Sequence, residues 1–96
     1  MGIPRYAAKR DRNEPEIVNC LKENGCLVWR LDRPVDLLIH HPDGHTYLAE
    51  VKTPEGKLNQ LQQQFLREWP NVAIFRSVDD ARLWVDNEKV RHAKSS

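Results

Sequence analysis

The segment VDLLIHHPDGHTYLAEVK, residues 35–52, decides the fold. Two runs rich in apolar, β-branched and aromatic residues, 35–41 and 46–52, flank the tripeptide PDG at 42–44. Proline, aspartate and glycine in succession are typical of a tight turn between strands. The segment therefore predicts a β-hairpin whose two strands pair antiparallel.

This hairpin carries three charged residues on strands that otherwise hold mostly apolar side chains. Successive side chains of a strand point to opposite faces, so Glu50 and Lys52 share a face of the second strand. A tight turn joins the strands, so the end of the second strand lies beside the start of the first, where Asp36 stands. The sequence predicts two carboxylates and an ammonium group at one edge of the sheet. The alternative interpretation is an ordinary cross-strand salt bridge, which contributes little.

Residues 13–25, upstream of the hairpin, predict a helix. Asn13 is a suitable N-cap, Pro15 lies in the first turn and Glu16 stands three residues after the cap, as in a capping box. An apolar stripe follows, and Gly25 is a suitable C-terminal stop.

The remaining patterns complete an α/β domain. They predict a strand at 26–31, a helix at 59–69, a short buried strand at 72–75 and a last helix from 77 to about 86. The order is αβββαβα, and the crossover through the second helix makes the third and fourth strands parallel. The expected fold is a central mixed four-stranded sheet flanked by helices. Residues 1–12 are expected to form a basic arm, and residues 88–96 a frayed polar tail.

Composition limits the possible functions. The 96 residues suffice for one domain, with 40% hydrophobic and 30% charged residues. A net charge of +1 excludes a strongly basic nucleic-acid coat. The sequence has no apolar run of membrane-spanning length and no signal peptide, so we expect a cytoplasmic protein. Cys20 and Cys26 are expected to be reduced, because their spacing matches no familiar zinc motif.

Glu14 is placed where an apolar residue is expected. At about 100° per residue, it falls on the apolar stripe of the first helix, whereas Glu16 falls on the opposite side. A one-turn register error would exchange the two residues. A carboxylate that points inward is costly unless it is paired or binds a cation. The alternative is that Glu14, in the first turn, reaches solvent and favours the helix dipole.

The second predicted helix also carries a polar residue on its apolar face. One glutamine, Gln62, lies on its apolar face and points towards the strand end that carries Glu50 and Lys52. A glutamine bonded to backbone at the edge of the core is the alternative. The residues of this apolar face are Leu58, Leu61, Phe65, Leu66 and Trp69.

Carboxylates, an amide and a lysine together suit a hard divalent cation. Mg²⁺ binds oxygen ligands, takes one or two protein carboxylates and uses phosphate oxygens of its substrate. A cation there would activate water and neutralise developing charge, and Lys52 would assist. The predicted chemistry is hydrolysis of a phosphodiester. A second acid-x-Lys triplet, Glu55-Gly56-Lys57, falls in a loop and is expected to be solvated.

At these residues the chain resembles a known family. Asp36 followed by Glu50-Val51-Lys52 resembles the PD-(D/E)xK nuclease motif, with Val35 in place of the usual proline and Pro34 one position earlier. Residues 50–62 resemble the virus-type replication-repair nuclease (VRR-NUC) domain, in which a Gly-x-Leu stretch precedes a helical glutamine. Here these are Gly56, Leu58 and Gln62. The resemblance covers residues 13–80 and extends to Holliday-junction resolvases.

The resemblance implies a restriction-endonuclease-like core and a metal-dependent DNA endonuclease. Asp36, Glu50 and the Val51 carbonyl would bind Mg²⁺ or Mn²⁺, and Glu14 would bind the metal through water. Lys52 would handle the attacking water, and Gln62 would orient Lys52 or a water molecule. Such proteins are typically small homodimers from bacteria or phages that cut branched DNA such as Holliday junctions.

Basic residues near the expected site could hold the DNA backbone. They are Arg10, Arg12, Arg30, Arg33 and Lys57. A function of a different class remains open, namely a non-catalytic nucleic-acid-binding module on the same fold. A histidine metal site is not expected, because His40 and His41 point to opposite faces of one strand. His41 and His45, which flank the turn, are expected to meet solvent or phosphate.

Overall fold

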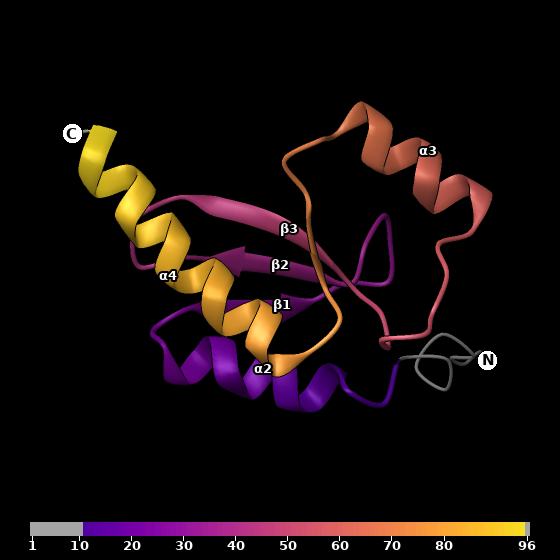
Figure 1. The fold of residues 1–96 in the computed structure, drawn as a ribbon, viewed down its shortest axis with the longest axis horizontal. Coiled ribbons are helices and arrows are strands. Elements are labelled where there is room, and N and C mark those ends of the chain that lie inside the picture. Colours follow the sequence, from indigo (N-terminus) through magenta and orange to yellow (C-terminus); the bar gives the residue numbers. More distant parts are fainter. Residues whose placement is uncertain (1–10, 96) are drawn as a thin grey trace.

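A computed structural model describes the backbone of residues 11–95 and the side chains of residues 11–88. It shows an α/β fold in which helices pack on one mixed four-stranded sheet (Figure 1). The elements are α2 (Glu14–Glu23), β1 (Leu27–Arg30), β2 (Leu37–His40), β3 (Thr46–Val51), α3 (Gln60–Glu68), β4 (Ala73–Phe75) and α4 (Val78–Ser95). Within the described residues, the predicted order of helices and strands is confirmed.

The sheet has the order β1-β2-β3-β4. Both the β1–β2 and β2–β3 pairs are antiparallel, whereas β3 and β4 are parallel, as predicted. In the hairpin Leu37 lies opposite Ala49, and Gly44 has a positive φ of 94°, which a residue with a side chain rarely adopts. The turn residues therefore fix the register of the two central strands.

The core lies between the sheet and the helices α2 and α4, which lie side by side (Figure 1). Leu37 and Ile39 of β2 point into this core, and Leu38 and His40 point to the opposite face, as alternation requires. The buried residues of this core cluster are Ile17, Val18, Cys20, Leu21, Cys26, Leu37, Ile39, Ala49, Val51, Phe75, Ala81 and Val85. Burial of these side chains is the main stabilising contribution to the fold.

The start of α2 differs from the prediction. Asn13 is the N-cap residue, but its side chain does not cap the helix, so the predicted capping box with Glu16 is wrong. The Asn13 amide instead donates to the carbonyls of Lys52 (3.0 Å) and Arg76 (3.1 Å). The Asn13 side chain therefore bonds to residues that are distant along the chain and not to the backbone of its own helix. Gly25, with a φ of 93°, ends the helix as predicted.

Helix α3 lies away from the body of the molecule (Figure 1). No residue of α3 is buried, and Leu61 is 75% exposed, so the predicted apolar face does not pack on the sheet. Phe65 and Trp69 stack on each other at a ring distance of 5.9 Å. The amphipathic pattern predicted the helix correctly, but such a pattern does not say what covers the apolar face.

Helix α4 is longer than predicted. It continues to Ser95, so the prediction that this helix ends at about residue 86 is wrong. Residues 78–95 contain no glycine or proline, and Glu88 is buried against the sheet. The helix therefore has no sequence break after residue 86 and has packing that supports its continuation. Neither α4 nor any other helix within residues 11–95 is long and apolar enough to cross a membrane.

His41 does not face solvent or phosphate, contrary to the prediction. Its side chain is fully buried, and Nε2 lies 2.9 Å from the carbonyl oxygen of Val85. Nδ1 accepts a hydrogen bond from the amide of Asp43 at 2.9 Å. The two contacts hold both nitrogens of the buried ring in place. His41 thus ties the hairpin turn to α4, whereas His45 is exposed as expected.

Candidate active site

Two carboxyl groups meet where β2 begins and β3 ends. The register that pairs Leu37 with Ala49 continues to Asp36 and Glu50, and a hydrogen bond joins their side chains. Asp36 is fixed further because its Oδ2 accepts the amide of Val51 at 2.8 Å. Glu50 is only 3% exposed. The hairpin therefore brings these two predicted site residues together.

Two further predicted residues contact the same oxygen of Glu50. Lys52 Nζ lies 3.8 Å from Glu50 Oε2, and Gln62 Nε2 donates to that oxygen at 2.7 Å. Gln62 also forms a capping box with Asn59, in which each side chain accepts from the other residue's backbone amide. The capping box fixes the first turn of α3 and so aims Gln62 at the sheet, although the rest of α3 stays exposed.

The pKa of Glu50 is raised from 4.5 to about 8. Burial is the largest cause, because it disfavours the charged form of a carboxyl group. The negative charge of Asp36 is the next cause, and Lys52 acts in the opposite direction. At neutral pH Asp36 and Glu50 therefore hold a proton between them. A cation bound between the two carboxyl groups could neutralise their charge in place of the shared proton.

The residues around this pair fit a divalent metal. The backbone amide of Val51 donates to the Asp36 side chain. In a β-strand, the N–H and the C=O of one residue point towards the same neighbouring strand. The Val51 carbonyl thus lies on the Asp36 side of β3. Among the described side chains, no three His, Cys, Asp or Glu groups converge into a metal-binding set. The chain would supply two carboxylates, a number that Mg²⁺ accepts when water and substrate oxygens complete the shell.

Glu14 is buried in the first turn of α2. It is 1% exposed whereas Glu16 is exposed, so the structure selects Glu14 as the inward carboxylate of α2. Arg30 Nε lies 3.2 Å from Glu14 Oε2. Glu14 therefore forms an ion pair with Arg30. The predicted contact of Glu14 with a metal ion through water stays a prediction.

Arg30 was predicted to contact DNA, and it has a structural partner as well. Its side chain is 47% exposed, but its Nε is committed to Glu14. We expect Arg30→Met to lower the free energy of unfolding by about 2 kcal/mol, because it removes a cation that lies against a buried carboxylate. Urea denaturation at neutral pH measures this change.

Two further variants identify the cause of that loss. The double variant Glu14→Gln, Arg30→Met should regain most of the stability, because it removes the buried charge as well. Arg82→Met breaks an exposed pair with Asp79 at 3.3 Å and should cost less than about 0.5 kcal/mol. A cost at Arg30 no larger than the cost at Arg82 would contradict the prediction.

The other predicted DNA contacts are solvent-accessible where the structure describes them. Arg12, Arg33 and Lys57 are exposed, and Arg10 lies outside the described residues. A residue that the sequence analysis missed organises the loop before Lys57. Arg76 Nη1 donates to the carbonyls of Thr53 (2.9 Å) and Gly56 (2.6 Å). No local motif identifies Arg76, because its partners lie 20 and 23 residues earlier.

Asn13 connects the start of α2 to the strand ends beside the site, through the Lys52 and Arg76 carbonyls. We expect Asn13→Ala to cost about 2 kcal/mol, the sum of two partly buried hydrogen bonds. Asn19→Ala, at an exposed position of α2, is the matched control and should change stability by less than about 0.5 kcal/mol. Thermal and urea unfolding would show the difference, and equal costs would contradict it.

No known protein family, no curated protein and no solved structure matches this chain. Function is therefore inferred from the residues of the site and their geometry.

Proposed function

We propose that this protein is a divalent-metal-dependent DNA endonuclease of the PD-(D/E)xK type, with a restriction-endonuclease-like core similar to the VRR-NUC domain. The observation that carries the proposal is the arrangement around Glu50. Asp36 is hydrogen-bonded to it, and both Lys52 and Gln62 reach its Oε2. An acid pair beside a lysine at the ends of adjacent strands suits phosphodiester hydrolysis.

In this proposal each residue has a distinct role. Asp36, Glu50 and the Val51 carbonyl hold Mg²⁺ or Mn²⁺, which supplies charge neutralisation for the phosphate and acidifies water. Lys52 stabilises negative charge that develops on the phosphate and orients the attacking water. Gln62 holds Glu50 Oε2 in place, because its own side chain is anchored by Asn59. The site is thereby positioned before substrate arrives.

The proposed substrate is branched DNA such as a Holliday junction, cut by a homodimer in the cytoplasm of a bacterial or phage-infected cell. Exposed Arg12, Arg33 and Lys57 support contacts to the phosphate backbone, and no base-reading motif is present in the sequence. Exposed apolar residues, such as Trp29 on the sheet and Leu61 on α3, support association of two copies. Two sites related by a two-fold axis would suit paired nicks.

A cleavage assay tests the proposal. Four-way junction, flap and duplex DNA are incubated with the protein and Mg²⁺, Mn²⁺ or EDTA, and Lys52→Ala serves as the inactive comparison. We expect metal-dependent cutting that is fastest on the junction and lost in Lys52→Ala. Binding of the junction without cleavage under every metal condition would instead establish the non-catalytic binding module.

A further inference from the structure

Helix α3 carries one residue of the candidate site but buries none of its own residues (Figure 1). Its two aromatic rings, Phe65 and Trp69, stack on each other. The position of a helix in a protein is normally set by packing of its apolar face. Gln62 of α3 nevertheless donates to Glu50 Oε2 at 2.7 Å, so contacts other than apolar packing hold the start of α3 beside the sheet.

The loop between β3 and α3 begins with a tight turn at residues 53–56. The Gly56 amide donates to the Thr53 carbonyl at 3.0 Å, and Pro54 occupies the second position of the turn, where proline is favoured. Arg76 Nη1 donates to the carbonyls of the first and last turn residues, Thr53 at 2.9 Å and Gly56 at 2.6 Å. Hydrogen bonds from a charged donor are stronger than neutral ones. Arg76 therefore fastens the turn at both of its ends.

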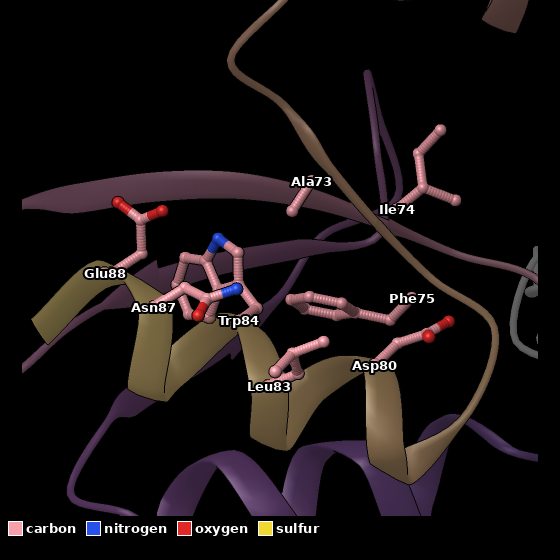
Figure 2. Close-up of a pocket in the computed structure, with 8 residues that line it drawn as sticks. All are labelled: Ala73, Ile74, Phe75, Asp80, Leu83, Trp84, Asn87 and Glu88. Atoms are coloured by element: carbon pink, nitrogen blue, oxygen red, sulfur yellow. The ribbon is translucent and has the colours of Figure 1, made fainter. Parts of the chain in front are cut away.

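Arg76 is itself held by the body of the molecule. It directly follows β4, and its amide donates to Asp80 Oδ2 of α4 at 2.8 Å. Figure 2 shows Asp80 near Phe75, the last residue of that strand. The Arg76 carbonyl accepts a hydrogen bond from the Asn13 side chain at 3.1 Å. The Arg76 side chain thus links the turn to the two helices that cover the sheet.

The turn passes this constraint to Gln62 over a short length of chain. Asn59, the N-cap of α3, stands three residues after Gly56, so their Cα atoms are at most about 11 Å apart. The capping box between Asn59 and Gln62 fixes the Gln62 side chain relative to the first turn of the helix. A displacement of the turn at 53–56 would therefore move Gln62 away from Glu50.

We propose that Arg76 is a positioning residue of the site, because it holds Gln62 against Glu50 through the turn at 53–56. Its effect on metal binding rests on the proposed function, whereas the linkage from Arg76 to Gln62 does not. Loss of a residue that supports a metal ligand typically weakens binding about 10- to 100-fold. If Arg76 only stabilised the fold or only contacted a DNA phosphate, its loss would leave the Gln62 side chain in place in the free protein.

NMR of the metal-free protein tests the linkage. The signals of the Gln62 side-chain amide are compared in the parent and the variants, with Glu50→Ala as the reference for a lost contact. We expect Arg76→Met to move the signals towards the reference, and Arg76→Lys, which keeps the charge and a donor, to move them less. Arg76→Lys decides the test if Arg76→Met does not fold. Arg82→Met, which removes an exposed arginine of α4, is the matched control and should leave the signals unchanged.

Unchanged Gln62 signals in the Arg76 variants would overturn the proposal. Mn²⁺ affinity, measured by calorimetry, then tests the consequence for the site. Arg76→Met and Gln62→Ala should each weaken Mn²⁺ binding about tenfold, and Arg76→Lys less than about threefold. Because both residues act through one contact, the double variant Gln62→Ala, Arg76→Met should bind less than about twofold more weakly than Gln62→Ala alone.

Two outcomes separate this proposal from the proposed function. Losses that multiply to about 100-fold in the double variant would mean that Arg76 acts independently of Gln62, and this would overturn the proposal. A parent protein that binds no Mn²⁺ would overturn the proposed function instead. The Gln62 signals alone would then decide whether Arg76 holds Gln62 against Glu50.

Discussion

Glu50→Gln is expected to reduce DNA cleavage at least about 10³-fold, a loss of about 4 kcal/mol of transition-state stabilisation. Glutamine has nearly the same shape as glutamate, and it can keep an oxygen for the Gln62 amide, which now donates at 2.7 Å. It cannot supply the negative charge that a divalent cation requires. The chain should therefore stay folded and lose the activity that depends on metal.

Glu55→Gln is the matched control for this loss. Glu55 begins the second acid-x-Lys triplet of the chain, but it is exposed in the loop after β3. Single-turnover cleavage of a junction substrate with Mn²⁺ should be unchanged in Glu55→Gln. Circular dichroism of both variants should match the parent. A Glu50→Gln protein that cuts as fast as Glu55→Gln would contradict the assignment of the site.

The sequence was sufficient to predict the contacts within the hairpin. The distance along the chain between Asp36 and Glu50 is short, the turn between them is strongly marked, and strand alternation determines the faces. Glu14 was also assigned correctly to the inward side of its helix, because helical periodicity alone distinguishes it from Glu16. Local geometry therefore accounts for these predictions.

The contacts that the sequence did not predict have the opposite origin, since each joins segments that are distant along the chain. The Glu14–Arg30 pair joins α2 to β1, and His41 is buried because α4 supplies the Val85 carbonyl. Asn13 was predicted to be a cap, but the strand ends offered it two carbonyl acceptors. The residue pattern of one segment does not show which groups of another segment will contact it. These partners could therefore be identified only in the folded structure.

The raised pKa of Glu50 predicts that the protein loses stability as the pH rises, provided that a chelator removes metals. Between about pH 4.5 and about pH 8, the folded chain keeps a proton that the unfolded chain has released. Folding is then favoured by protons, so the free energy of unfolding falls across this window. A shift of this size corresponds to a loss on the order of 4 kcal/mol by pH 9.

Urea denaturation of the parent and of Glu50→Gln from pH 5 to pH 9 measures the effect. Glutamine resembles the protonated carboxyl group at every pH, so the two proteins should be about equally stable near pH 5. The variant should then become increasingly more stable than the parent from about pH 5 to about pH 8, and the difference should level off above pH 8. Other titrating groups act on both proteins and cancel in the difference, whereas Glu55→Gln should show no such trend. A difference that does not change with pH would mean that Asp36 and Glu50 are not forced to share a proton, and the physical reason for a cation between them would be lost.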